Sequence, residues 1–407
     1  MAAGGEDLVK LNLGEPDFDA PKHVADKAIE QIRAGNGHYC HPAGIEPLRR
    51  AIAHHVSETR DLDVDWRRVV VHTGGKPSIG YTMLTYVEPG DEVIYPSPGF
   101  PVYESWVTFV GARPVPLRLR EESGFALRAD DLAELITERT KVIIINSPSN
   151  PTGGAIDEEE LARIAEVIGE RGRDDLRVYS DEIYEHILFD DLQHASIASC
   201  DGMAERTIIS SGASKSYAMT GWRLGWAVLP AREEAEVFKN LNINIVSCVP
   251  PFIQEAVREA LESPETEKVV AAMVDAFDER RHAVVEALND VDGISCVMPH
   301  GAFYVFPNVG EACERLGAVE AFEALPPEDQ PRSSPSTLLQ MFALYRHRVA
   351  TMDRPSFCRI GSEGEHYLRL SIATDKDSLL EGVARLESAA ADSEGFAEFI
   401  DGGGPFH

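Results

Sequence analysis

The chain has 407 residues, of which 43% are hydrophobic and 26% are charged. This composition is typical of soluble globular proteins and excludes disordered or collagen-like chains. With 68 acidic and 38 basic residues the net charge is −30, which repels nucleic acid and anionic membrane surfaces. No run reaches the ~20 apolar residues of a membrane span, and the first residues lack the features of a signal peptide. We therefore expect a cytoplasmic protein with no nucleic-acid partner and no membrane association.

The cysteines are dispersed along the chain and form no CxxC pair or Cys/His cluster. Such spacing indicates neither a disulfide scaffold nor a zinc site. We expect reduced, packed thiols and no metal centre. The six residues are Cys40, Cys200, Cys248, Cys296, Cys313 and Cys358.

Between about Val69 and Pro230, short apolar runs alternate with amphipathic segments. Strand and helix signals that alternate in this way predict an α/β fold with a mainly parallel sheet covered by helices on both faces. The expected strands are 69–71, 92–95, 115–117, 142–145, 177–179, 207–209 and 225–228, and the expected helices include 79–87, 103–110, 130–136 and 158–169.

After Pro230 the pattern changes to long helical periodicity, followed by a return of strand signals. This change predicts a smaller α/β domain at the C-terminus. We therefore divide the chain into an N-terminal segment, 1–38, that packs with the small domain, a large domain, 39–290, and a small domain, 291–407. The expected helices are 232–244 and 252–288, and the expected strands are 294–298, 302–306 and 367–372.

A single lysine surrounded by small residues follows the expected strand at 207–209, in the run Gly212, Ala213, Ser214, Lys215. Small neighbours leave room for a group bonded to the amine. A lysine in a pocket can have its pKa lowered enough to form a Schiff base with an aldehyde cofactor, and Arg223 could hold a phosphate nearby. Taken alone, the Ser-Lys pair fits an exposed lysine at a helix start equally well.

Two further polar segments, 146–153 and 179–184, also follow expected strands. The C-terminal ends of parallel strands form the edge at which doubly wound sheets bind ligands. A carboxylate at the end of a buried strand needs a cationic partner, and a protonated pyridine nitrogen would be one. Asp181 is therefore a candidate partner of an electron-withdrawing ring.

In this order, the three segments resemble the class I aminotransferases, which are similar to aspartate aminotransferase and belong to the pyridoxal-phosphate enzymes of fold type I. The resemblance to the lysine signature is unbroken over residues 212–225. Other stretches resemble the opening motif of the family, its tyrosine segment, the turn at the cofactor phosphate and the strand that bears the substrate-binding arginine. These stretches are 12–18, 38–44, 73–76 and 367–371.

The resemblance implies how the residues at the sheet edge act on pyridoxal 5'-phosphate. Lys215 would form the internal aldimine and then move a proton between the substrate Cα and C4′ of the cofactor. Asp181 would keep the pyridine nitrogen protonated. Asn150 and Tyr184 would hydrogen-bond the phenolic oxygen, and each contact would stabilise charge that develops during the reaction.

The resemblance also implies the remaining contacts to the cofactor. Phe100 falls where the family stacks an aromatic ring, although a core phenylalanine explains it nearly as well. The backbone amides of Gly74 and Gly75, together with Arg223, would bind the phosphate. Tyr39 would reach the same phosphate from a second subunit, which implies a homodimer.

One cofactor position departs from the family pattern. Many members carry a hydroxyl residue three positions before the lysine as a phosphate ligand, and here that residue is Gly212. Either Ser211 or Ser214 is a candidate replacement, and the sequence does not choose between them.

For the substrate, the resemblance implies that Gly14 and Asn150 lie beside it and that Arg369 binds its α-carboxylate, a bidentate contact that suits arginine. Lys76 aligns with a lysine that approaches the distal carboxylate in some aspartate-using members, although a surface lysine is equally plausible. The expected reaction transfers the amino group of an L-amino acid, aspartate or glutamate being favoured, to a 2-oxo acid such as 2-oxoglutarate by a ping-pong mechanism.

Two other functions remain open. The same cofactor chemistry supports a β-lyase, which would eliminate a β-substituent and release pyruvate and ammonia. A regulator that retains the fold without catalysis is disfavoured because no DNA-binding extension is present and the catalytic set is intact. That set comprises Lys215, Asp181, Asn150, Arg223 and Arg369.

Overall fold

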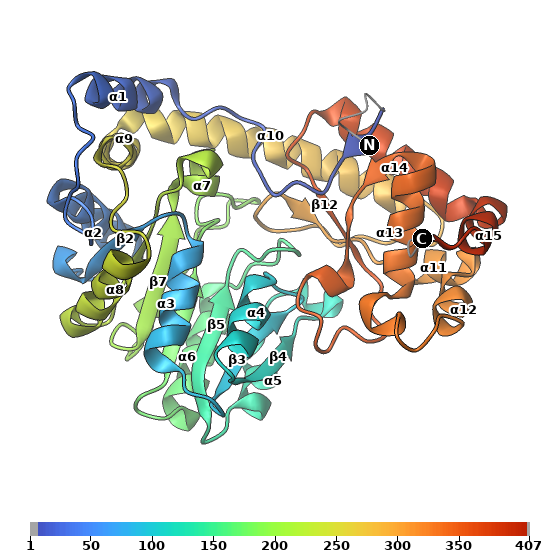
Figure 1. Cartoon of the computed structure of the whole chain (residues 1–407), viewed down its shortest axis with the longest axis horizontal. Coiled ribbons are helices and arrows are strands. Elements are labelled where there is room, and N and C mark those ends of the chain that lie inside the picture. Colours follow the sequence, from blue (N-terminus) through green and yellow to red (C-terminus); the bar gives the residue numbers. More distant parts are fainter. Residues whose placement is uncertain (1–6, 405–407) are drawn as a thin grey trace.

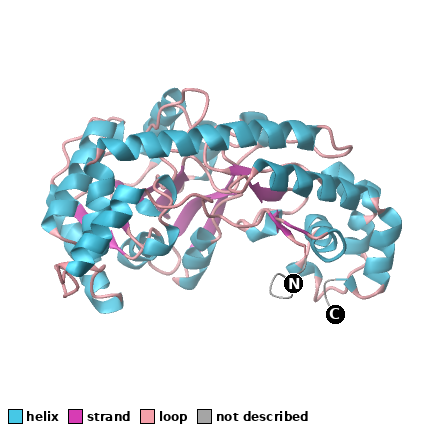
Figure 2. Ribbon diagram, turned by 90° about the horizontal axis from the view of Figure 1, so that it is seen from above, coloured by secondary structure: helices cyan, strands magenta, loops and turns pink. Residues whose placement is uncertain are grey.

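The structure is a computed structural model that describes residues 7–404. It contains a large α/β body built on a seven-stranded sheet and a smaller body in the C-terminal part of the chain, with the long helix α10 (Pro264–Asn289) running along both (Figure 1). In the view from above, helices enclose the strands, which lie in the interior (Figure 2).

The large sheet has the strand order β2-β8-β7-β6-β5-β3-β4. All of its pairings are parallel except those of β8, which is antiparallel to both β2 and β7. The mainly parallel seven-stranded sheet of fold type I is therefore confirmed. Its strands are β2 (Val69–His72), β3 (Glu92–Ser97), β4 (Arg113–Arg118), β5 (Thr140–Asn146), β6 (Arg177–Asp181), β7 (Thr207–Gly212) and β8 (Gly225–Val228).

Helices cover both faces of this sheet because consecutive strand residues point in opposite directions. Val69 and Val71 pack into a core with helices α1, α2 and α9, whereas Val70 packs on the other face with α3, α4 and α8. Strands buried on both faces read as continuous apolar runs, as the sequence does here. The helices of this body are α1 (Lys22–Arg33), α2 (Glu46–Arg60), α3 (Lys76–Tyr86), α4 (Val102–Phe109), α5 (Ala129–Leu135), α6 (Glu158–Arg171), α7 (Ala213–Ser216), α8 (Arg232–Ile245) and α9 (Pro251–Glu262).

The N-terminal segment contacts both bodies. Strand β1 (Val9–Lys10) pairs in parallel with β10 (Val349–Ala350) of the smaller body. Helix α1, by contrast, buries Val24 and Ala28 in the core shared with α2 and α9. The domain boundaries at residues 38 and 290 stay a prediction.

The long helical periodicity at 252–288 is not one helix. It breaks at Ser263, whose hydroxyl accepts a hydrogen bond from the Glu265 amide at 3.4 Å, and Pro264 then begins α10. Proline lacks the N–H that a continuous helix needs and is favoured in the first turn. Within residues 7–404, no helix is long and apolar enough to span a membrane.

The strand expected at 294–298 is wrong. Only an isolated bridge between Ser295 and Asn308 forms there. The side chain of Asn289 bonds the backbone N–H and C=O of Cys296, at 2.8 and 3.1 Å, and these bonds replace those of a strand ladder.

The sheet of the smaller body has the order β11-β12-β9. The helices and strands of the smaller body, besides β10, are β9 (Tyr304–Val305), α11 (Gly310–Leu316), α12 (Ala318–Glu323), α13 (Pro335–His347), β11 (Met352–Asp353), β12 (Leu368–Ser371), α14 (Lys376–Ala391) and α15 (Ser393–Asp401).

Candidate active site

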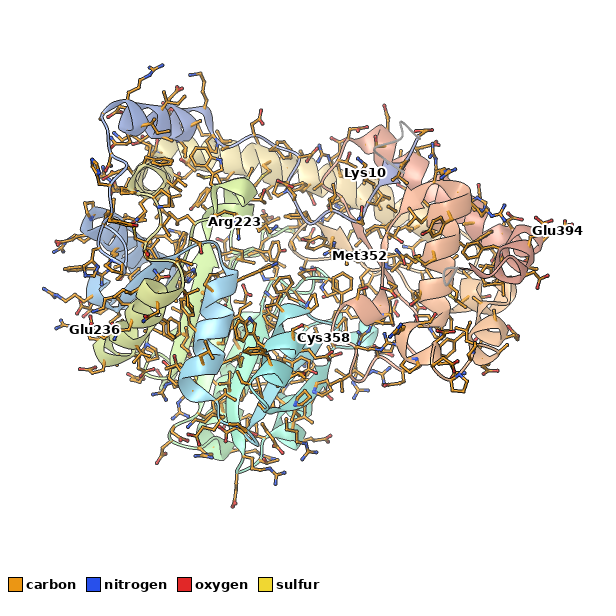
Figure 3. All side chains as sticks on the ribbon, in the orientation of Figure 1. Lys10, Arg223, Glu236, Met352, Cys358 and Glu394 are labelled. Carbon is orange, nitrogen blue, oxygen red and sulfur yellow. The ribbon has the colours of Figure 1, made fainter. Side chains whose placement is uncertain are left out.

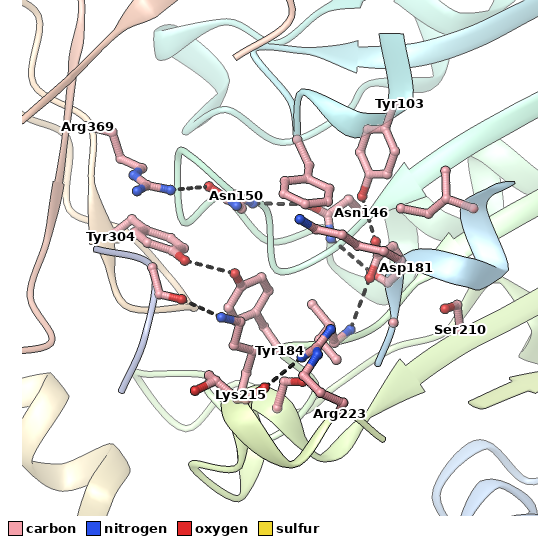
Figure 4. Close-up of a pocket in the computed structure, with 18 residues that line it drawn as sticks. Tyr103, Asn146, Asn150, Asp181, Tyr184, Ser210, Lys215, Arg223, Tyr304 and Arg369 are labelled. Carbon is pink, nitrogen blue, oxygen red and sulfur yellow. Dashed lines mark hydrogen bonds between the residues drawn. The ribbon is translucent and has the colours of Figure 1, made fainter. Parts of the chain in front are cut away.

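A cavity of about 280 Å³ lies at the C-terminal edge of the large sheet. Asn146, Asp181 and Gly212 are the last residues of the adjacent parallel strands β5, β6 and β7, so the segments that follow them meet at this edge. Most of the expected site residues line the cavity (Figure 4). These are Gly14, Gly75, Lys76, Phe100, Asn150, Asp181, Tyr184, Ser214, Lys215, Arg223 and Arg369.

Lys215 lies in the short helix α7, directly after β7, and its side chain points into the cavity (Figure 4). Its Nζ donates a hydrogen bond to the backbone carbonyl of Gly14, which the N-terminal segment brings to the site. Burial, together with the positive charge of Arg369, lowers the pKa of the Lys215 amine to about 8. A substantial share of the amine is therefore neutral near pH 8 and able to act as a nucleophile.

Asp181 ends strand β6 and is buried. Its Oδ2 accepts a hydrogen bond from the Tyr103 hydroxyl at 2.7 Å, and its Oδ1 accepts one from the Ile183 amide at 3.4 Å. Burial raises the pKa of this carboxyl to about 6, and the Tyr103 hydrogen bond opposes the rise. Asp181 forms no ion pair with any residue between 7 and 404, so this buried carboxylate fits a cationic ring nitrogen as its partner.

Two tyrosines and an asparagine face the middle of the cavity. The hydroxyls of Tyr184 and Tyr304 are 3.0 Å apart. Asn150 follows β5, and its Oδ1 accepts a hydrogen bond from Arg369 Nη1 at 3.1 Å. This bond orients the amide of Asn150 so that its nitrogen remains free to donate, as Tyr184 can from the adjacent wall.

Arg369 lies on β12 and crosses to the cavity from the smaller body. Its guanidinium lies 4.4 Å from the Tyr304 ring centroid, and its Nη2 donates to the Asn12 carbonyl at 2.8 Å. The Met352 sulfur, 3.1 Å from Nη2, supports the same group from β11. Arg369 Nε is buried without a hydrogen-bond partner among the described residues, a donor that suits a substrate carboxylate.

An anion-binding cradle forms where β2 meets α3. Gly74 has φ +78°, and a Cβ there would lie 2.0 Å from Arg223 Nη2, so only glycine admits the guanidinium at this distance. Gly75 and Lys76 open α3, whose first amides point out of the helix. Arg223, beside α7 in Figure 3, donates to the Thr220 carbonyl at 2.6 Å. Guanidinium and helix N-terminus together fit a phosphate group.

Lys76 contributes an additional positive charge to the cavity. Its Nζ lies 5.7 Å from the centroid of the Phe100 ring. In the chain from residue 7 to 404, no carboxylate forms a salt bridge with it, so its charge is available to a ligand.

Two expected residues do not line the cavity. Gly74 lies behind Arg223, and Tyr39 is 89% exposed. Of the two serines considered for the phosphate, Ser214 lines the cavity, whereas Ser211 bonds Glu185 Oε1 at 2.7 Å. The roles of the expected site residues stay predictions.

Tyr103, Tyr304 and Asn146 also line the cavity but were missed from the sequence. Asn146 ends β5 and begins the polar segment 146–153, so its strand-end position was a usable signal. Tyr304 lies in an expected strand, and Tyr103 falls one helical turn after Phe100. An aromatic residue in a strand or a helix reads as core, and both side chains are indeed buried.

One edge of the sheet provides the three groups that pyridoxal phosphate requires of a protein. They are an amine to bond its aldehyde, a carboxylate for its ring nitrogen and a cradle for its phosphate. The fold and the cavity thus define a pyridoxal-phosphate enzyme of fold type I.

Within these enzymes, the chain belongs to the class I and II aminotransferases, whose family model matches residues 6–386. It is 37% identical to the probable aspartate/prephenate aminotransferase of Aquifex aeolicus over 96% of this chain and 92% of that protein. It is also 37% identical to the aspartate aminotransferase of Pyrococcus abyssi, over 95% and 92% of the two chains. Among solved structures, the aromatic aminotransferase from Pyrococcus horikoshii superposes with a TM-score of 0.84 at 34% identity, covering 96% of this chain and 97% of that one.

Proposed function

We propose that this transaminase takes its amino group from an acidic L-amino acid, aspartate or glutamate, and passes it to a 2-oxo acid such as 2-oxoglutarate. The observation that supports this choice is the pair of cations in one cavity, Arg369 and Lys76. An acidic amino acid carries two carboxylates, and two separated cations match that charge pattern. Relatives are named for aspartate, prephenate and aromatic amino acids, so the family alone leaves the donor open.

Pyridoxal phosphate, when bound, supplies an electrophilic carbonyl and a ring that withdraws electrons from the substrate Cα. Lys215 would provide the amine that holds the cofactor, and the same amine would take the proton from the substrate Cα. Because the pKa of Lys215 is lowered to about 8, the group accepts and returns a proton near neutral pH with little energetic cost.

The other residues hold charge in place during proton transfer. Asp181 would hold the ring nitrogen of the cofactor and keep it protonated, while Asn150 and Tyr184 would donate to its phenolic oxygen. Arg369 binds the α-carboxylate through Nε, its buried unpartnered nitrogen, and orients Cα toward Lys215. The use of one cavity first by the amino acid and then by the 2-oxo acid supports a ping-pong mechanism.

We further propose that the enzyme is a homodimer in which Tyr39 donates to the cofactor phosphate of the partner. The Tyr39 side chain is almost fully exposed in the single chain. The carbonyl of nearby Pro42 accepts a 2.7 Å hydrogen bond from the Asn242 side chain of α8. Ile243 and Ile245, which follow Asn242 on α8, expose their apolar side chains. Light scattering should give twice the chain mass, and Tyr39→Phe should weaken cofactor binding.

Steady-state kinetics test the proposed reaction. Initial rates with L-aspartate and 2-oxoglutarate varied together should give parallel double-reciprocal lines, and kcat/KM for aspartate should exceed that for alanine and phenylalanine. Intersecting lines would contradict the ping-pong mechanism. Release of pyruvate and ammonia from a β-substituted amino acid, without a 2-oxo acid, would instead identify a β-lyase.

A further inference from the structure

The end of β6 and the loop that follows it contribute to two different cavities. Asp181 and Tyr184 line the cofactor cavity, whereas His186 lines a second cavity of about 530 Å³. The intervening carboxylates, Glu182 and Glu185, are buried and bonded to Arg60 of α2, with Arg60 Nη2 at 2.7 and 2.5 Å from their Oε2 atoms.

This buried cluster has an excess of negative charge. Two carboxylates face one guanidinium. His55 and His194 bond Glu185 and Glu182 at 3.1 and 3.0 Å, and the hydroxyls of Ser180, Ser196 and Ser211 donate to the same carboxylates. A divalent cation beside Glu185 would balance the second carboxylate.

Three side chains at the edge of the cluster are arranged as ligands for such a cation. One ring nitrogen of His55, one of His186 and one carboxylate oxygen of Glu185 all lie within 4.8 Å of one another. His55 Nε2 is 3.1 Å from Glu185 Oε2. A tetrahedral zinc site with bonds of about 2.0–2.1 Å separates its ligand atoms by about 3.3 Å, so small side-chain adjustments are sufficient.

Outer contacts already orient these side chains. Arg60 holds Glu185 Oε2, and Ser211 Oγ donates to Glu185 Oε1 at 2.7 Å. The Tyr217 hydroxyl lies 3.3 Å from His186 Nε2. Hydrogen bonds of this kind fix ligand orientation in metalloproteins.

The second cavity provides access and an open coordination position. Both histidines line it, and so do the carboxylates of Glu262, Glu267 and Asp275. These acidic groups attract divalent cations to the cavity. A water molecule entering from the cavity would complete four-coordination.

We propose that His55, Glu185 and His186 bind a divalent transition metal of the zinc class, with water as the fourth ligand. The metal joins α2 to the loop after β6 and, through Ser211, to the strand that precedes Lys215, so its role is to stabilise this part of the fold. Sequence spacing could not indicate the site, because 130 residues separate His55 from Glu185.

Zinc binding to the holoenzyme, freed of unbound cofactor, tests the proposal. Wild type, His55→Gln and His54→Gln are titrated with Zn²⁺ alone by calorimetry at pH 7.5 and analysed for metal after dialysis. His54 is the matched control, since it precedes His55 on α2 but its side chain is 75% exposed. Wild type and His54→Gln should each bind one more zinc ion per chain than His55→Gln. Zinc should raise the melting temperatures of wild type and His54→Gln and leave that of His55→Gln unchanged.

Zinc held elsewhere, for example by thiols, is common to all variants and cancels in the comparison. His186→Gln, which retains a polar partner for Tyr217, provides a second test if His55→Gln fails to fold. Equal stoichiometry in wild type and both ligand variants, or no zinc retained by wild type, would overturn the proposal.

Discussion

The Tyr103 hydroxyl donates a 2.7 Å hydrogen bond to Oδ2 of Asp181. Both side chains are buried, and the tyrosine comes from the start of α4 while the aspartate ends β6. Because the carboxylate has no ion-pair partner within residues 7–404, this bond is the main contact that opposes the rise of its pKa. Tyr103 is therefore placed to keep Asp181 ionised at the pH at which the enzyme works.

Replacing Tyr103 with phenylalanine should raise the pKa of Asp181 above about 6. A hydrogen bond to a charged group contributes about 1.5–3 kcal/mol, so the rise should be about one to two units. Only the ionised carboxylate can pair with a protonated ring nitrogen. As the pH is lowered, the affinity of the apoenzyme for the cofactor should therefore begin to fall at a higher pH in Tyr103→Phe than in wild type. Tyr81→Phe, which loses a bond to Asn242 instead, should leave the profile unchanged.

Asp181→Asn should fold but lose several orders of magnitude in kcat, because an uncharged ring nitrogen is a much poorer electron sink. Circular dichroism and single-turnover kinetics with L-aspartate provide the measurement. Turnover close to the wild-type rate would show that another residue protonates the ring.

Lys215→Ala should bind pyridoxal phosphate without the visible absorbance of the covalent form and should lose turnover. In the wild-type apoenzyme, covalent attachment should accelerate as the pH rises through about 8, because the neutral amine is the nucleophile and the pKa of Lys215 is lowered to that value. Stopped-flow absorbance follows the attachment. A rate independent of pH between 6 and 9, or transamination by the alanine variant, would contradict the assignment.

Lys76→Met should raise KM for L-aspartate about 10- to 100-fold, because it removes a charged contact of about 1.5–3 kcal/mol to the distal carboxylate. KM for L-alanine, which lacks that carboxylate, should change little. Lys239→Met serves as the control, since Lys239 pairs with Glu236 outside the cavity. Equal effects on both substrates would mean that Lys76 does not select the acidic side chain.

The large sheet and the polar residues at its edge could be predicted because local pattern carries both. Apolar runs bounded by polar strand ends made Asp181 and Lys215 candidates, and the resemblance to the class I aminotransferases assigned their roles. The strand expected at 294–298 failed because the side chain of Asn289 competes for the backbone of Cys296, which no strand pattern reveals. The break between α9 and α10 was missed, although Pro264 is a residue that disfavours a helix interior.

Contacts between distant segments were beyond prediction from local pattern. Tyr103 and Tyr304 are aromatic residues in regular elements, and only folding directs their hydroxyls to Asp181 and Tyr184. The cluster around His55 and His186 likewise depends on how α2 packs against the loop after β6. Spacing along the chain carries no information on such pairs.

A spectroscopic half-reaction tests the central claim most directly. Purified enzyme is loaded with pyridoxal phosphate and titrated with L-aspartate in the absence of any 2-oxo acid, and 2-oxoglutarate is then added. The visible band of the Lys215-bound cofactor should convert to the ultraviolet band of the amine form with one equivalent of oxaloacetate released, and 2-oxoglutarate should restore it. A visible band that L-aspartate leaves unchanged, while another amino acid converts it, would contradict the acidic-donor assignment, and no visible band at all would contradict the role of Lys215.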